Sequence, residues 1–217
     1  MSKRELAKRY FLFVVGLFFS GLGVAFSKHG SIGVTPISSI PNIVNLRFPA
    51  ISMGTLLLIW NCILVMGQIA ILRRKFKIVN LLQIPLSFLF GMFTDLGLML
   101  FEGIPLDPYI WKLICVVLGI LFLGFGIAIQ VIADVIMNSG EAFVKAVSDT
   151  INKEFGNVKV VFDVCNVLVA IILSLIFFES VKGTREGTII AALTLGFVVK
   201  FMTPRIKPFL IKYIKNK

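Results

Sequence analysis

Two stretches of the chain that start 103 residues apart carry almost the same short sequence. Residues 15–26 read VGLFFSGLGVAF and residues 118–129 read LGILFLGFGIAI, with five of the twelve aligned positions identical. The identical positions are Gly16/Gly119, Phe19/Phe122, Gly21/Gly124, Gly23/Gly126 and Ala25/Ala128. An offset of about half the chain indicates an internal duplication, and duplicated apolar sequences are typical of transporters built from two repeats.

Six stretches are long and apolar enough to cross a membrane as helices, which takes about 20 mainly apolar residues each. The chain is 58% hydrophobic and 15% charged, whereas soluble domains are about 45–50% apolar and about 25% charged. The expected spans are 10–27, 54–72, 78–101, 110–135, 158–178 and 187–204. We therefore expect an all-α polytopic membrane protein with a single membrane domain over residues 1–217.

The net charge of +11 is spread unevenly along the chain. With the N-terminus inside, sixteen basic residues fall in inner segments: Lys3, Arg4, Lys8, Arg9, Arg73, Arg74, Lys75, Lys77, Lys145, Lys153, Lys159, Arg205, Lys207, Lys212, Lys215 and Lys217. Five fall in outer segments: Lys28, Arg47, Lys112, Lys182 and Arg185. Because basic residues concentrate on the cytoplasmic side of membrane proteins, both termini are expected in the cytoplasm. A charge placed this way indicates a lipid bilayer as partner and argues against nucleic-acid binding.

Each half of the chain holds three expected spans, so the second half should enter the membrane from the opposite side. Repeat one covers residues 10–101, repeat two covers 110–204, and a basic cytoplasmic tail follows over 205–217. Such repeats are related by a rotation of about 180° around an axis in the membrane plane. The expected fold is thus six transmembrane helices in two inverted three-helix repeats, with re-entrant or interfacial half-helices between spans.

Two segments between spans, 28–53 and 131–156, are too polar for ordinary spans and too apolar for plain loops. In the first, Thr35-Pro36 predicts a helix start, with a hydroxyl at the cap position and proline at the first helical position. In the second, Asn138 or Ser139 can cap a helix that Gly156 is expected to end. Both segments fit either interfacial helices on opposite membrane faces or re-entrant half-helices that dip toward the midplane, and the sequence leaves both open.

If both segments dip, their N-termini meet near one central site, where unpaired N–H groups can hold an anion. The candidate substrate-binding residues at these starts are Gly33, Thr35, Pro36, Ser38, Ser39, Asn138, Ser139 and Glu141. A carboxylate at Glu141 repels an anion unless it is protonated or paired. Glu141 is therefore also a candidate for binding a cation or for carrying a coupling proton.

Ionisable side chains within spans are costly to bury and are candidates for a function. The chain offers Asp95, Asp134, Asp163 and Lys200. Residues 91–95 align with 196–200, which places Asp95 and Lys200 at equivalent positions with opposite charge. Either the two side chains pair, or each reaches its own membrane interface. Amides and hydroxyls form a second polar layer within or beside the spans: Asn61, Gln68, Asn80, Gln83, Thr94, Gln130, Asn138, Asn166 and Thr194.

Several glycine motifs recur along the chain: Gly21-x-Gly23, Gly33-x-x-Pro36, Gly54-Thr55 and Gly91-x-x-x-Asp95, echoed by Gly124-x-Gly126, Gly187-Thr188 and Gly196. This pattern resembles the YczE-like branch of the YczE/YyaS/YitT family of bacterial integral membrane proteins over nearly the whole chain. The resemblance implies a multi-pass protein of the bacterial cell membrane. Members of that family usually carry an acidic residue two positions after the proline, where this chain has Ser38, while Glu141 keeps a carboxylate at the equivalent position in the second half.

Enzymatic and metal-dependent chemistry are not indicated by the sequence. It contains no nucleophile with a base and orienting group, no P-loop and no His-Glu-x-x-His spacing. His29 is the single histidine, and Cys62, Cys115 and Cys165 all fall within expected spans. We therefore expect no catalytic residues, no metal and no cofactor.

A small secondary transporter or permease is the function that these patterns favour. Its substrate is expected to be a small metabolite, anionic or zwitterionic, bound near the midplane between the repeats. Two alternatives are a substrate-binding subunit of a modular ATP-driven vitamin uptake system, against which the inverted repeat counts, and a non-transporting accessory protein. Whether two copies form a homodimer is left open by the sequence.

The charge distribution predicts that reporters fused to either terminus remain on the cytoplasmic side. A C-terminal phosphatase that is active only outside the cytoplasm should be inactive, and a C-terminal fluorescent reporter that folds only inside should be bright. The opposite pattern would contradict the predicted orientation.

Overall fold

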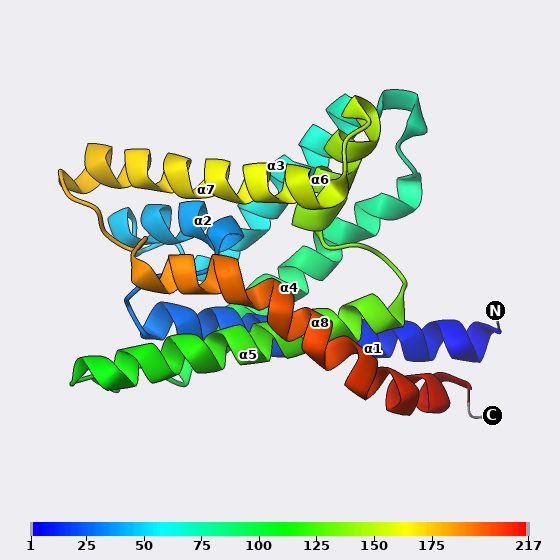
Figure 1. Ribbon diagram of the computed structural model, residues 1–217, viewed down its shortest axis with the longest axis horizontal. Coiled ribbons are helices and arrows are strands. Elements are labelled where there is room, and N and C mark those ends of the chain that lie inside the picture. The colour runs from blue at the N-terminus through cyan, green and yellow to red at the C-terminus, as the bar shows by residue number, and fades with distance from the viewer. Residues whose placement is uncertain (1, 216–217) are drawn as a thin grey trace.

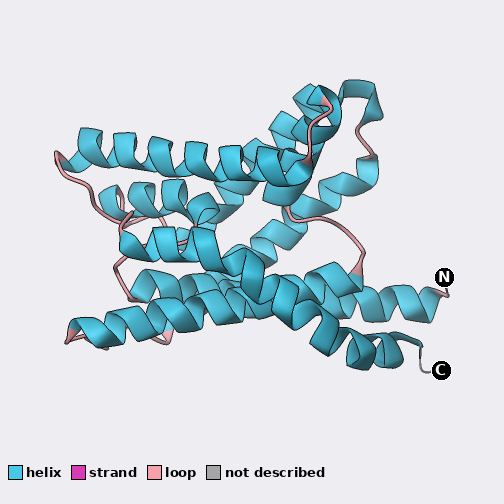
Figure 2. Ribbon diagram, viewed as in Figure 1, coloured by secondary structure: helices cyan, strands magenta, loops and turns pink. Residues whose placement is uncertain are grey.

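The computed structural model describes residues 2–215, and within that range every regular element is a helix (Figures 1 and 2). The α-helices are α1 (Lys3–His29), α2 (Pro36–Arg47), α3 (Met53–Leu72), α4 (Gln83–Met99), α5 (Tyr109–Ala133), α6 (Ser139–Ile151), α7 (Phe155–Phe178) and α8 (Glu186–Lys215). Two short 3₁₀-helices, η1 (Arg73–Lys75) and η2 (Ile78–Leu82), connect α3 to α4.

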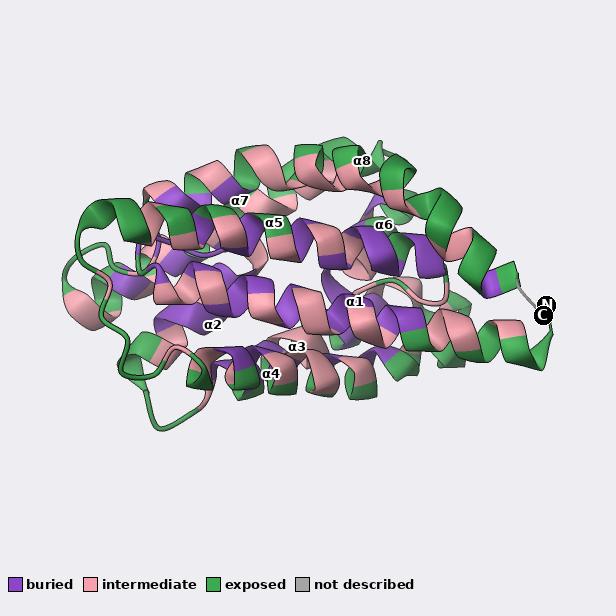
Figure 3. Ribbon diagram, turned by 90° about the horizontal axis from the view of Figure 1, so that it is seen from below, coloured by how far each residue is buried: buried purple, intermediate pink, exposed green. Residues whose placement is uncertain are grey.

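Six helical stretches in the described chain are long and apolar enough to span a membrane, which confirms the expected all-helical polytopic fold. They are α1, α3 with η1, η2 with α4, α5, α7 and α8. Figure 3 shows that buried residues concentrate on α1 and α5, whereas α8 is mostly exposed or half-buried. The exposed positions on the outer helices are largely apolar, as a surface that faces lipid requires.

The antiparallel pair of α1 and α5 lies at the centre, and its two backbones touch at the repeated glycines. A Cβ placed on Gly23 would lie 2.5 Å from Leu123 N and 2.7 Å from the Gly119 carbonyl oxygen. A Cβ on Gly126 would lie 2.5 Å from the Gly16 carbonyl oxygen. Each glycine of one half therefore meets the non-equivalent glycine of the other half, as two antiparallel copies of one motif would.

Phe19 and Phe122, which are aligned in the two halves, stack on each other with ring centroids 6.0 Å apart. Equivalent residues can touch only where a twofold axis would pass between them. The wider packing follows the same exchange: α4 packs on α1 as α8 packs on α5, and α2 packs on α7 as α3 packs on α6. These pairings are those that an inverted repeat needs, and the rotation of about 180° stays a prediction.

The half-helices α2 and α6 begin in the middle of the molecule and run outward (Figure 1). Thr35, which precedes α2, is buried, whereas the middle of α2 reaches the end of α1, where Lys28 Nζ donates to Asn42 Oδ1 at 2.8 Å. Ser139, the first residue of α6, is buried in the same way. A buried start with an outward course favours the re-entrant interpretation over helices that lie flat on opposite faces.

One expected boundary is wrong, and the expected tail turns out to continue a helix. The second half-helix ends at Ile151 because Asn152 takes the left-handed conformation (φ 53°) that closes a helix, and Gly156 lies inside α7 instead. The expected basic tail is helical as far as Lys215, because α8 continues through Pro204 and Pro208. Figure 1 shows α8 bent along its course, as prolines inside a helix require.

The contact between α1 and α5 predicts that a single methyl group on Gly23 destabilises the protein. Gly23→Ala should lower the free energy of unfolding by about 1–3 kcal/mol, because backbone and not a flexible side chain must move away. Gly196→Ala is the matched control: the space around Gly196 is empty within 4 Å, so alanine should stabilise the helix by about 0.5–1 kcal/mol. Thermal unfolding of both variants in the same detergent should show a lower melting temperature for Gly23→Ala and a higher one for Gly196→Ala. Equal changes in melting temperature would contradict the prediction.

Candidate functional site

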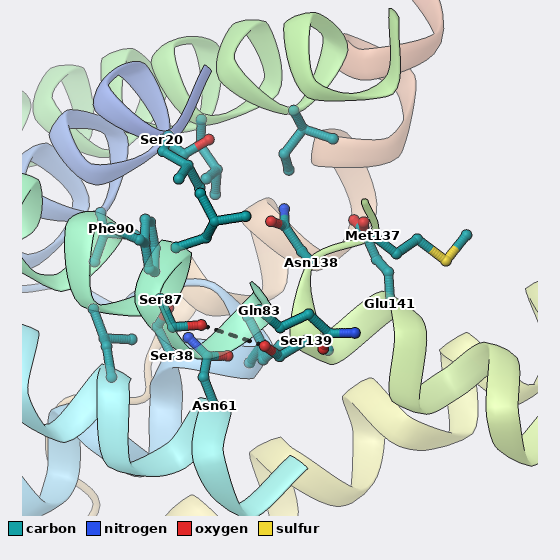
Figure 4. Close-up of a pocket in the computed structure, with 18 of the residues that line it drawn as sticks. Ser20, Ser38, Asn61, Gln83, Ser87, Phe90, Met137, Asn138, Ser139 and Glu141 are labelled. Carbon is teal, nitrogen blue, oxygen red and sulfur yellow. Dashed lines mark hydrogen bonds between the residues drawn. The ribbon is translucent and has the colours of Figure 1, made fainter. Parts of the chain in front are cut away.

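A central cavity with a volume of about 140 Å³ lies where α2 and α6 begin (Figure 4). All eight α-helices contribute to its wall. One water molecule needs about 10–15 Å³ on the same measure, so the cavity has room for a small metabolite. We call it the central cavity.

The wall of the central cavity is mostly apolar, with polar groups that come from several helices. The apolar part is formed by Phe13, Leu17, Val24, Ile37, Leu57, Leu86, Phe90, Leu123, Ile127, Ile136, Met137 and Leu195. The polar groups belong to Ser20, Thr35, Ser38, Trp60, Asn61, Gln83, Ser87, Asn138, Ser139, Glu141 and Lys159. Apolar walls with a few converging polar groups are typical of sites for small molecules.

The start of α2 presents its first turn to the cavity without a side-chain cap. Thr35 occupies the cap position, but its hydroxyl donates to Ser38 Oγ at 3.0 Å instead of accepting from the helix. The Ser39 hydroxyl in turn donates to the Thr35 carbonyl oxygen at 3.1 Å. Thr35 and Ser38 line the cavity, whereas Pro36 and Ser39 do not. The predicted helix start at Thr35-Pro36 is confirmed.

The start of α6 is fixed against α3 and α4 by a buried amide network. Gln68 Nε2 donates to Gln83 Oε1 at 3.0 Å and to the Ser139 carbonyl oxygen at 3.1 Å, and Gln83 Nε2 donates back to Gln68 Oε1 at 3.2 Å. The hydroxyls of Ser87 and Ser139 lie 3.3 Å apart, as the dashed line in Figure 4 marks. Asn138 occupies the cap position of α6, but its side chain makes no capping hydrogen bond. The N-termini of both half-helices therefore face one cavity uncapped.

One carboxyl group and one ammonium group line the central cavity, those of Glu141 and Lys159. Burial raises the pKa of the Glu141 carboxyl; the positive charge of Lys159 opposes that rise and the negative charge of Asp163 adds to it. Lys159 Nζ also donates to Asp163 Oδ1, one helical turn further along α7. These three groups carry a net charge of −1 when Glu141 is ionised and are neutral when it is protonated.

The other predicted site residues lie away from the central cavity. Asp95 Oδ1 accepts a hydrogen bond from Gly54 N at 2.7 Å and so caps α3. Asp134 is the exposed left-handed residue that ends α5, and Lys200 is exposed on α8. Within residues 2–215 no ion pair joins Asp95 to Lys200, so of the two alternatives the structure does not show the pairing. Gly33 lines a second cavity.

Sequence reasoning did not single out Trp60, whose buried Nε1 has no hydrogen-bond partner in the described chain and which lines the central cavity. An indole within an apolar span reads as a packing residue, so only its position beside Asn61 hinted at a polar site. Ser20 and Ser87 were missed for the same reason. Among residues 2–215, no three His, Cys, Asp or Glu side chains come together as a metal site.

The sequence matches the model of a family of unknown function (DUF6198) over residues 7–204, which includes both halves and every residue of the central cavity. No curated protein and no solved structure matches the chain.

Proposed function

We propose that this chain, which belongs to the family of unknown function DUF6198, is a small secondary transporter or permease whose substrate site is the central cavity. The observation that carries the proposal is that two uncapped half-helices begin at one cavity within a membrane-spanning bundle. Broken helices that meet at the midplane hold substrates in transporters built from inverted repeats. The resemblance to the YczE-like membrane proteins supports a location in the bacterial cell membrane, and the distribution of basic residues supports both termini in the cytoplasm.

A small zwitterion with an apolar body fits the chemistry of the cavity best. The uncapped start of α6, Trp60 Nε1 and the Lys159 ammonium offer donors to a carboxylate. Glu141 offers an acceptor to an ammonium group, or a proton to couple with transport. The surrounding Leu, Ile and Phe side chains suit the apolar part.

Two equivalent helix pairs differ in a way that suits alternating access. Gly54 and Gly91 bring α3 and α4 into backbone contact, since a Cβ on Gly91 would lie 2.5 Å from the Gly54 carbonyl oxygen. In the second half, Gly156 is likewise the second residue of its helix and Gly196 aligns with Gly91, yet each has empty space within 4 Å. Inverted repeats change the accessible side by exchanging their conformations. We infer that α7 and α8 close at these glycines when α3 and α4 separate.

Cysteine cross-linking tests that exchange. In a background with Cys62, Cys115 and Cys165 replaced by serine, Gly156→Cys with Gly196→Cys should form a disulfide on mild oxidation in liposomes, because closure brings the Cα atoms within about 7 Å. Gly156→Cys with Phe197→Cys is the control, since Phe197 is exposed on another face of α8. Equal cross-linking of both pairs, or none of either, would contradict the exchange.

Flux through proteoliposomes tests the function itself. The wild-type protein should carry at least one small carboxylate or zwitterion from a metabolite panel, and Thr35→Val should weaken its binding. Glu141→Gln should abolish net flux if Glu141 carries the coupling proton, and should strengthen anion binding if it only repels. Asp149→Asn, an exposed change on α6, is the control. If Thr35→Val and Glu141→Gln both leave binding and flux unchanged, the site lies elsewhere; binding without flux favours an accessory or uptake-subunit role.

A further inference from the structure

A second cavity, with a volume of about 280 Å³, lies at the end of the molecule where α1 and α7 finish, and it shares no lining residue with the central cavity. Its wall consists of Ser27, Lys28, Ser31, Gly33, Val34, Asn42, Leu46, Val181, Lys182, Gly183 and Arg185. Three of these residues are cations and none is acidic. We call it the basic cavity.

Lys28 differs from the other two cations because, in the described chain, it has neither a carboxylate nor an aromatic ring as a partner. The Lys182 ammonium lies 4.9 Å from the centre of the Phe178 ring, and Arg185 donates to the Glu186 carboxylate. The Lys28 ammonium donates only to the neutral amide of Asn42, at 2.8 Å, and no carboxylate within residues 2–215 forms an ion pair with it. Asn42 is itself held by a hydrogen bond to the Gly183 carbonyl oxygen. A charge partly withdrawn from water is costly unless an opposite charge is supplied.

A second unpartnered group lies in the same wall. Ser27 is 1% exposed, and its hydroxyl has no hydrogen-bond partner in the described chain. Buried hydroxyls are normally hydrogen-bonded. The Ser27 oxygen faces Gly119 of α5, so the group in this wall that an oxyanion would satisfy is the Lys28 ammonium, which has no counter-charge.

We propose that the basic cavity binds an oxyanion, a carboxylate or a phosphate, with Lys28 as its counter-charge and Lys182 and Arg185 as the cations that attract it. A free solute and the headgroup of an anionic lipid share this chemistry. The site belongs to one half of the protein only, because the position that aligns with Lys28 in the second half is Val131.

One short segment separates the basic cavity from the central cavity. Gly33 and Val34 line the first, and the next residue, Thr35, lines the second. The segment is fixed to the start of α8, where Gly187 N donates to the Ile32 carbonyl oxygen at 2.9 Å. Gly33 has φ 135°, and a Cβ on it would lie 2.5 Å from Thr188 N, so only glycine fits. If the proposed transport function holds, only the segment from Gly33 to Thr35 separates an oxyanion bound in the basic cavity from the substrate site.

Equilibrium binding of inorganic phosphate to the purified full-length protein tests the site without measuring flux. At constant ionic strength, phosphate should raise the melting temperature of the wild type in a saturable way, with sodium chloride as the reference. Lys28→Gln should raise the phosphate concentration needed for half of the saturating shift by about tenfold or more, since it removes a charge-assisted contact. Lys112→Gln is the matched control, because it removes the same charge elsewhere in the outer segments.

Asn42→Asp keeps the test decisive if Lys28→Gln fails to fold. The new carboxylate would sit beside the Lys28 ammonium, supply the missing counter-charge inside the protein and exclude the anion. A lipid arm separates the two sources: protein purified from mixed phosphatidylcholine and phosphatidylglycerol should retain phosphatidylglycerol, as measured by mass spectrometry, if the ligand is a headgroup.

Each result has one meaning. Phosphate binding that both variants weaken identifies a free oxyanion, and phosphatidylglycerol retention that both variants lose identifies a headgroup; either supports the proposal. If the wild type, Lys28→Gln and Asn42→Asp behave alike in both arms, the proposal is overturned. That failure would leave the transport function standing, just as absent flux would leave the binding result standing.

Discussion

The backbone contact between α1 and α5 is the constraint on which the other helices depend. Lipid supplies no hydrophobic force between helices, so association in a membrane relies on small residues that allow close packing. In each copy of the repeated motif, two glycines form this contact: Gly16 and Gly23 in α1. The third glycine turns outward, so that Gly21 receives α4 at Phe93 and Gly124 receives α8 at Val198. One short motif, used twice, thus positions four of the six long helices.

The central cavity lies beside the pair of α1 and α5, where α2 and α6 begin. The half-helices α2 and α6 begin beside the central pair, and each is reached through a non-helical segment inside the protein, which membranes tolerate only next to protein or a polar cavity. In the first segment, the Ile32 carbonyl oxygen accepts a hydrogen bond from Gly187 N. At the end of the second segment, the Ser139 carbonyl oxygen accepts one from Gln68 Nε2. Neither Thr35 nor Asn138 caps its own helix with its side chain, and under the proposed function the start of α6 offers its free N–H groups to an acceptor on the substrate.

Length and hydropathy were enough to predict the six spans, and the hydroxyl–proline pair was enough to predict where α2 begins. The capping residues Asn138 and Ser139 predicted the start of α6, whereas its place beside the start of α2 was one of two alternatives that the sequence left open. The alternative in which Asp95 pairs with Lys200 is not seen, for a geometric reason: if the halves are inverted, equivalent residues meet only on the axis between them, as Phe19 and Phe122 do. The end of α6 was misplaced because Asn152 adopts a conformation that glycine usually takes. The role of Trp60 depends on which atoms surround its Nε1 in the folded protein, and a sequence pattern does not predict those neighbours.

Asp95 and Lys200 also make the two halves chemically unequal. The Asp95 carboxylate accepts from Gly54 N at the start of α3, where the helix dipole favours a negative charge. The equivalent position on α8 is Lys200, and a cation at the start of α7 would be unfavourable there. Under the proposed exchange, the arrangement with α3 and α4 closed is therefore the resting one, and a substrate must bind the other arrangement more tightly to shift the population.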